Sequence, residues 1–226
     1  CRDVLVSCRT NLVNTVRGLL KSQGLSLPSC STEAFVKKVS PILSSDLRPI
    51  FCELLNTIEE INSKIKKFDK LIIKKSDELY PEAKSVQQIK GIGPITSLAF
   101  ILTLEEHSRF KKSRDVGSFL GLVPKRDQSG ETDKQLSITK SGNCYLRSLL
   151  VSSAHYILGP FGEDCDLRRY GERIAARGGK TAKKKAVVAV ARKLGILMHS
   201  LWKSGEIYEP LRKTKKRRKK LLNTAA

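Results

Sequence analysis

A serine followed by glycine, Ser129-Gly130, lies between the cationic residues Lys125, Arg126 and Lys134. A serine hydroxyl can attack phosphorus and form a covalent phosphoester, provided that a base takes its proton and nearby positive charge stabilises the transition state. Ser129 is therefore a candidate nucleophile, and Lys125 and Arg126 are candidate phosphate contacts. The same residues also make an ordinary polar turn, and spacing alone favours that interpretation.

Two glycines, Gly91 and Gly93, separate two apolar segments of helical character, and Pro94 follows them. Glycine permits a tight turn and a close backbone approach, and proline suits the first position of a helix. The pattern resembles a helix-hairpin-helix module, whose free backbone amides hold a phosphate without reading sequence. The candidate nucleic-acid-binding residues here are Lys90, Gly91, Gly93 and Thr96. Two helices turning tightly inside a core remain the alternative.

A third candidate site begins at Lys140 and runs to Arg147. Ser141 or Asn143 is expected to cap the helix that follows Gly142. Lys140, Asn143 and Arg147 would then face phosphates. A capped core helix with solvated basic ends explains the same residues without a ligand.

The charge of the chain favours a polyanionic partner. Its 226 residues include 43 Lys and Arg against 22 Asp and Glu, which gives a net charge of +21. Such a balance is typical of nucleic-acid-binding proteins and also fits an anionic membrane surface. No apolar run is long enough to span a bilayer. A second basic cluster lies between 168 and 185, and the basic tail over 212–220 is predicted to be disordered.

Apolar periodicity predicts a mainly α fold with one long helix and a compact helical domain. The expected regions are a helical linker over 1–45, a coiled-coil-like helix over 46–80, a domain over 81–205 with the hairpin and an irregular serine loop, and a basic tail over 206–226. Within the domain, 121–142 is loop-like, although part of it could pair as a short β-hairpin.

The long helix carries an apolar residue at alternating intervals of three and four from Phe51 to Ile72. Three heptads of this kind fit a single helix that packs on its own domain. They equally fit an antiparallel or dimeric coiled coil, which would help to assemble a homo-oligomer.

The six cysteines form no C-x-x-C pair and have no histidine near them in sequence, so no zinc site is predicted. Free thiols suggest a reduced, cytoplasmic protein. The chain starts at Cys1 inside a helical pattern, and we expect it to be a fragment that lacks an N-terminal part.

Several motifs in succession resemble the C-terminal domain of bacterial insertion-sequence transposases of the one-ten family. They are the glycine hairpin, the run from Phe110 to Pro124, Ser129-Gly130, and the run from Ile138 to Arg147. The segment from Arg9 to Phe35 is similar to the one that joins the two domains of this family. The resemblance covers most of 2–205, and the order of the motifs is its specific feature.

The resemblance implies a DNA transposase-recombinase in which Ser129 is the nucleophile, with Ser137 and Ser141 as nearby alternatives. Many relatives have a second glycine where this chain has Glu131. The resemblance also implies a preceding RuvC-like domain whose carboxylates bind magnesium, a structured guide RNA, and a nucleoid location. The fragment alone would bind DNA or RNA without recombining it. The alternative is a non-catalytic helix-hairpin-helix module that binds nucleic acid.

Overall fold

The computed structural model describes residues 1–129, 132–179 and 181–212, and it is mainly helical, as the sequence predicts. The chain divides into two compact units, residues 1–74 and 75–226. Residues 47–74 of the long helix belong to the same compact unit as residues 1–45. The expected tail over 206–226 lies outside the described residues from 213 onward.

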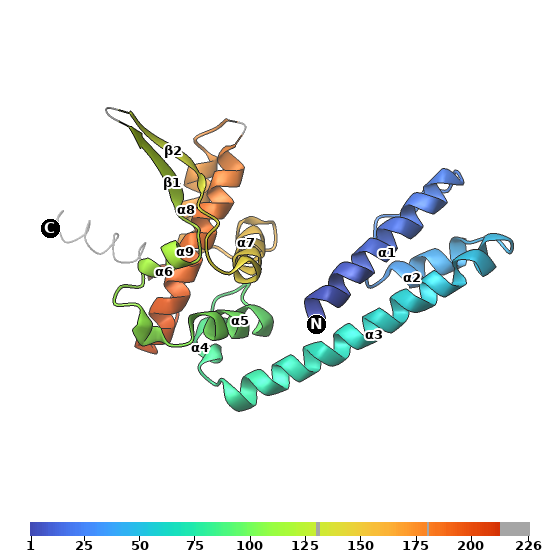
Figure 1. The fold of residues 1–226 in the computed structure, drawn as a ribbon, viewed down its shortest axis with the longest axis horizontal. Helices are drawn as coiled ribbons and strands as arrows, with labels where there is room; N and C mark the ends of the chain where they lie inside the picture. Colours follow the sequence, from blue (N-terminus) through green and yellow to red (C-terminus); the bar gives the residue numbers. More distant parts are fainter. Residues whose placement is uncertain (130–131, 180, 213–226) are drawn as a thin grey trace. The chain divides into compact units, whose positions relative to one another are not determined.

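The first unit is built from an antiparallel pair of long helices, α1 (Arg2–Ser22) and α3 (Leu47–Leu79), with the short α2 (Phe35–Val39) and a 3-10 turn (Ser40–Ile42) between them (Figure 1). Side chains in the first half of α1 contact side chains in the middle and second half of α3, as expected for antiparallel helices. The Arg9 guanidinium donates to Asn62 Oδ1 at 2.9 Å, and Arg2 pairs with Asp69.

Most of the apolar stripe of α3 packs within its own unit. Phe51 and Ile58 pack with Val16 of α1 and Phe35 of α2 in one core, and Ile65 is also buried. Of the two interpretations that the heptads allowed, the structure shows packing on the chain's own domain. The buried part of the stripe runs from Phe51 to Ile65, whereas Phe68 and Ile72 nearer the end of α3 are only partly buried.

The second unit is a helical bundle around α9 (Ala182–Ser204). Its other helices are α4 (Ala83–Gln87), α5 (Pro94–Leu104), a 3-10 turn (His107–Arg109), α6 (Asp115–Phe119), α7 (Cys144–Leu158) and α8 (Asp166–Ala175). The segment after α9 crosses back over the bundle, where Tyr208 N–H donates to the Gln88 side chain and Pro210 O accepts from Asp166 N–H.

α9 holds the bundle together because it buries residues along most of its length. Val190, Leu194, Met198 and Leu201 recur at helical spacing and are fully or nearly fully buried. α8 crosses α9 closely at Gly171, where an added Cβ would stand 2.7 Å from a methyl group of Val190. The bundle is therefore a single core with α9 as its shared element.

The expected irregular serine loop is largely a two-stranded antiparallel hairpin of β1 (Pro124–Ser129) and β2 (Thr132–Ile138). Residues 121–142 therefore follow the β-hairpin alternative that the sequence left open for part of this stretch. The register shifts between Pro124 and Arg126, so that β2 contains one extra residue there. β1 is exposed along most of its length, and the hairpin extends beyond the helices beside it (Figure 1).

Two glycines allow the base of this hairpin to pack backbone against backbone. Gly121 and Gly142 have φ values of +65° and +77°. An added Cβ at Gly142 would lie 2.1 Å from Phe119 O, and one at Gly121 would lie 2.2 Å from Ser141 O. Lys140 N–H donates to Gly121 O at 3.1 Å across the same contact. We call this contact between 119–123 and 139–142 the hairpin base.

Gly142→Ala is expected to destabilise the second unit by about 3 kcal/mol or more, because the positive φ costs about 1–2 kcal/mol and the clash forces the backbone apart. Chemical unfolding followed by circular dichroism measures the change. The matched control is Gly178→Ala, since Gly178 has φ +75° with nothing within 4 Å of an added Cβ. It should cost only about 1–2 kcal/mol. Equal losses in both variants would contradict the packing described for the hairpin base.

A histidine of α9 is buried in the second unit. His199 of α9 is 0% exposed, its Nε2 lies 3.0 Å from His107 O, and its Nδ1 lies 3.0 Å from Ser113 Oγ. Because the carbonyl can only accept, Nε2 donates and the neutral ring accepts at Nδ1. Burial lowers the pKa of His199 from its ordinary value of 6.5, despite the opposing hydrogen bond to His107.

The free energy of unfolding is expected to fall as the pH drops below about 6.5, because the unfolded chain then binds a proton that folded His199 resists. Above that pH both states hold a neutral ring and the contribution is constant. His199→Gln should be less stable at pH 8 but should lose less stability on acidification. Urea unfolding between pH 5 and pH 8 tests this, and parallel pH curves for the two proteins would refute it.

Candidate nucleic-acid site

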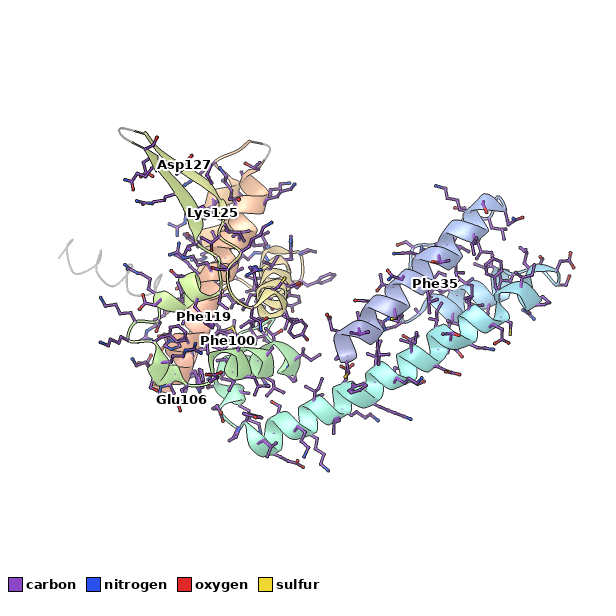
Figure 2. The ribbon with its side chains drawn as sticks, in the orientation of Figure 1. Phe35, Phe100, Glu106, Phe119, Lys125 and Asp127 are labelled. Carbon is purple, nitrogen blue, oxygen red and sulfur yellow. The ribbon has the colours of Figure 1, made fainter. Side chains whose placement is uncertain are left out.

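The structure places Ser129 at the end of β1, where it is exposed and opposite Thr132 in the hairpin register. Side chains alternate across a strand, so Lys125, Asp127 and Ser129 share one face of β1. Figure 2 shows the labelled Lys125 and Asp127 side chains on the hairpin. A hydroxyl at this position is accessible to a large substrate such as DNA.

The two alternative serines have different surroundings. Ser137 is exposed on β2 and lines a groove between the hairpin and α9. Ser141 belongs to the hairpin base, and its hydroxyl lies 3.1 Å from that of Thr139. Ser129 is therefore the one of the three that lies at the far end of the hairpin.

The cations predicted on the hairpin are exposed. The Arg126 guanidinium forms an ion pair with Asp133 across the strands at 3.6 Å, and the Lys125 side chain is solvent-exposed. Exposed ion pairs contribute little to stability, so Arg126 can exchange its partner for a phosphate at low cost.

In the glycine turn between α4 and α5, packing within the protein explains why one of the two glycines is needed. Gly91 has φ +94°, and an added Cβ would stand 2.7 Å from the Tyr156 ring. Gly93 is different, because it has extended backbone and open space around the position of a Cβ. Lys90 forms an exposed ion pair with Glu163 at 3.3 Å. Thr96 as a whole residue is only 8% exposed, so its hydroxyl is not a group that this turn presents on the surface.

Within the third candidate site, which runs from Lys140 to Arg147, one residue stabilises the hairpin base. Asn143 caps α7 by accepting from Leu146 N–H at 3.0 Å, as expected for one of the two candidate caps. One Arg147 nitrogen donates to Ser141 O at 2.8 Å and to Leu120 O at 3.2 Å. Arg147 therefore joins the two sides of the hairpin base, whereas Lys140, with φ +58°, is exposed.

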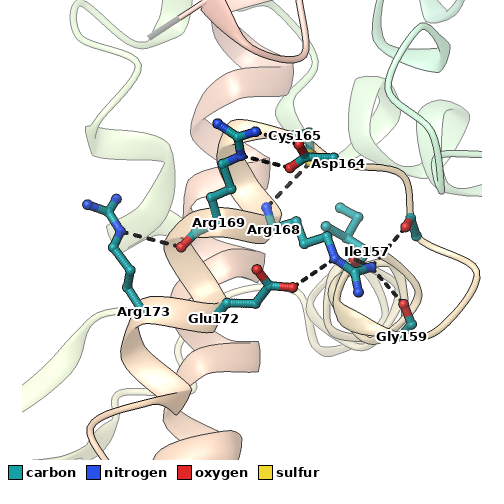
Figure 3. A network of polar contacts seen from close by, with 9 residues as sticks. Ile157, Gly159, Asp164, Cys165, Arg168, Arg169, Glu172 and Arg173 are labelled. Carbon is teal, nitrogen blue, oxygen red and sulfur yellow. Dashed lines mark hydrogen bonds and ion pairs between the residues drawn. The ribbon is translucent and has the colours of Figure 1, made fainter. Parts of the chain in front are cut away.

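Part of the basic cluster between 168 and 185 is also engaged inside the protein. One Arg168 nitrogen donates to the carbonyl oxygens of Ile157, Gly159 and Gly162, which closes the loop between α7 and α8 (Figure 3). Arg169 donates to Asp164 at 2.8 Å, and this hydrogen bond lowers the pKa of the Asp164 carboxyl. Both arginines form hydrogen bonds within the protein. The number of basic residues in this part of the sequence is therefore larger than the number of cations that face solvent without an internal partner.

Other cations of this cluster face a groove and have no acidic partner among the described residues. Lys184 and Lys185 are exposed in the first turns of α9. Arg114 and Arg192 join them from other parts of the chain, and the sequence analysis missed both. The groove brings together residues that are far apart in sequence, so no local sequence pattern could predict that these two arginines belong to it.

The described residues offer no metal site and no membrane span. Over 1–129, 132–179 and 181–212, no group of three or more His, Cys, Asp or Glu side chains is placed to hold a metal ion. The resemblance assigns the magnesium-binding carboxylates to a preceding domain, so this observation on the described residues does not bear on that expectation. No helix in this part of the chain is long and apolar enough to cross a bilayer.

Residues 83–161, from α4 through the hairpin to α7, match the family model described as "Transposase IS116/IS110/IS902 family". The chain is similar to transposases of this family. The matched segment contains the glycine turn, the hairpin and the hairpin base, so the candidate site and the family match coincide.

Individual transposases extend the similarity over most of the chain. The transposase for insertion sequence element IS1111A of Coxiella burnetii is 30% identical over 92% of this chain and 58% of its own length. The transposase for element IS1328 of Yersinia enterocolitica is 30% identical over 68% of this chain and 46% of its own. A pilin gene-inverting protein of Moraxella bovis is 33% identical over 54% of this chain and 37% of its own. The chain thus spans about half the length of these transposases.

Arg147→Lys is expected to lower the stability of the second unit by about 1–2 kcal/mol, because lysine keeps the charge but loses the paired hydrogen bonds. DNA affinity per folded molecule should stay within about twofold. Thermal unfolding and fluorescence anisotropy with labelled DNA provide the two readouts. Full stability with strongly reduced DNA affinity would mean that Arg147 contacts phosphate and does not hold the hairpin base.

Proposed function

We propose that this chain acts in a DNA transposase-recombinase and that Ser129 is the nucleophile that attacks a DNA phosphate. The supporting observation is the position of Ser129, exposed at the end of a hairpin that extends beyond the helices, in a chain similar to insertion-sequence transposases. A serine held this way can approach a phosphate without the bulk of the protein intervening.

The reaction needs no external energy source, because phosphoester bonds are exchanged. Ser129 Oγ forms a bond to phosphorus, the bond from phosphorus to one deoxyribose oxygen breaks, and the serine proton is lost while the departing oxygen gains one. Attack by the hydroxyl of a second strand then reverses the step and releases the serine. Lys125, on the same face of β1 as Ser129, would add positive charge on the side where the transition state forms, and Arg126, on the other face, would bind a neighbouring phosphate. Carboxylates and magnesium would come from outside the described residues.

The hairpin is also suited to reach into DNA. A two-stranded β-ribbon fits the major groove, and an isolated hairpin is only marginally stable without a surface to pack on. The exposed Leu136 on β2 adds an apolar contact. Lys140 and the first amides of α5 after Gly93 would hold backbone phosphates on either side.

Further partners follow from the same charge. A structured guide RNA would occupy basic surface that the DNA leaves free, and assembly into a homo-oligomer on DNA would bring two serines to the two strand ends. Binding of this kind would keep the protein on the bacterial nucleoid.

The second candidate function is a non-catalytic module that tethers nucleic acid. Gly93 favours it, since neither packing nor backbone conformation requires glycine there and a close backbone approach by phosphate would. Both functions predict salt-sensitive DNA binding. The tethering function alone predicts that no covalent protein–DNA species forms.

Ser129→Ala, in a transposase that carries this chain, should reduce strand exchange by roughly a thousandfold or more, because the attacking oxygen is removed. DNA binding should stay within about twofold. A plasmid excision assay and an electrophoretic mobility shift give the two readouts.

Ser137→Ala and Ser141→Ala are the matched controls, since each removes one hydroxyl from the neighbouring sequence. Both should retain most of the strand exchange. Loss of exchange in either control with normal exchange in Ser129→Ala would reassign the nucleophile, and normal exchange in all three would favour the tethering module.

A further inference from the structure

A groove runs between the hairpin and the first half of α9. It encloses about 570 Å³ and is lined on one side by Pro124, Ser137 and Ile138 and on the other by Val188 and Ala189. This volume falls within the range of ordinary ligand sites. The groove belongs wholly to the second unit.

The charges around this groove are all of one sign. The lining cations are Arg114, Lys184, Lys185, Arg192 and Lys193, and none of the described residues that line it is acidic. In the described part of the chain, no carboxylate pairs with Lys184 or Lys185. A groove whose described lining carries several cations and no acidic residue is suited to an anion of several charges.

Two of these cations are held in place by their surroundings. The Arg192 side chain lies against α6 at Gly117, where an added Cβ would stand 3.1 Å from its Cγ and Nε. Lys193 Nζ lies 3.4 Å from the centre of the Tyr170 ring. Holding a cation before the ligand arrives reduces the entropy that binding would otherwise cost.

The floor of the groove is apolar and includes an aromatic ring. Ile138, Val188 and Tyr170 are partly buried and pack on the core of the unit. Lys193 covers one face of the Tyr170 ring, so the floor that a base can contact includes the aliphatic side chains of Ile138 and Val188. Cations beside an apolar floor suit a single strand, whose phosphates contact the charges while its unstacked bases contact the floor. The stacked bases of a duplex cannot reach such a floor.

An adjoining groove does not share this character. It is bounded by α8, α9 and the segment after α9, and it also contains Tyr170 and Lys193. Asp166, Glu172 and Glu209 line it as well, so its charge is mixed. Complementarity to phosphate is therefore concentrated in the groove beside the hairpin.

We propose that the groove between the hairpin and α9 binds a single nucleic-acid strand, with phosphates on Lys184, Lys185 and Arg192 and a base on the apolar floor. This assignment rests on the proposed function, in which the chain acts on nucleic acid. It places an unpaired strand beside the hairpin that carries Ser129. The strand is either DNA separated from its complement or an unpaired stretch of RNA.

The lysines at the start of α9 are unfavourable for the stability of the helix, which supports a role in binding. Cations in the first turn of a helix are disfavoured by the helix dipole, and α9 has no acidic residue there. Replacing them should therefore leave the fold as stable as before or slightly more stable. Loss of binding without loss of stability separates a ligand contact from a structural one.

The test compares Lys184→Gln/Lys185→Gln with Lys111→Gln/Lys112→Gln in the full chain. Both variants remove two adjacent exposed lysines, and only the first pair lines the groove. Anisotropy is measured with labelled oligothymidine, oligouridine and a DNA duplex of matched length. The groove variant should bind single strands roughly tenfold more weakly at about 0.1 M salt, with a salt slope smaller by roughly 1.4, as expected when two single-strand phosphate contacts are lost. The control should change by less than about threefold.

The outcomes separate this proposal from the proposed function. A wild-type chain that binds no DNA or RNA would overturn both. Equal loss of single-strand affinity in the two variants, or equal loss of duplex and single-strand affinity in the groove variant, would overturn the groove while leaving DNA binding intact. Displacement of the strand by polyglutamate at equal charge concentration would also overturn it. Preference for oligothymidine or for oligouridine identifies the strand as DNA or RNA.

Discussion

The hairpin base is the contact on which the candidate site depends. Gly121 and Gly142 let two backbone segments approach within hydrogen-bonding distance, and Arg147 joins the carbonyl oxygens on both sides. A polar two-stranded hairpin has too little apolar surface to hold its own direction in water. Fixing its base on the bundle around α9 is what gives Ser129 and the neighbouring groove a defined relation to each other.

The distribution of charge follows from the same arrangement. Several cations of the second unit stabilise loops from within, as Arg168 does at the end of α7 and Arg147 does at the hairpin base. Those that remain on the surface include Lys125 on the hairpin and Lys184 on α9. Net charge therefore indicates a polyanionic partner, whereas only the partners of each cation indicate where that partner binds.

The helices and the cap at Asn143 were predictable from sequence because apolar spacing and capping are local properties. The hairpin was harder, since β1 has no alternation of apolar and polar residues to indicate a strand. Contacts between distant residues could not be predicted at all. Gly91 is explained by Tyr156, His199 is held by His107 and Ser113, and Arg192 lies over Gly117. The stripe of α3 shows the same limit, because its pattern allowed packing within the chain's own domain but did not identify α1 and α2 as the partners.

Mapping the covalent bond between protein and DNA tests the proposed role of Ser129 most directly. A DNA substrate with sulfur in place of the departing bridging oxygen should trap the phosphoester in the complete transposase, because the released thiol attacks phosphorus poorly. Mass spectrometry of the digested complex should then find the nucleotide on Ser129 Oγ. A nucleotide on Ser137, on Ser141 or on any other residue, or a complete reaction without a covalent species, would contradict the account.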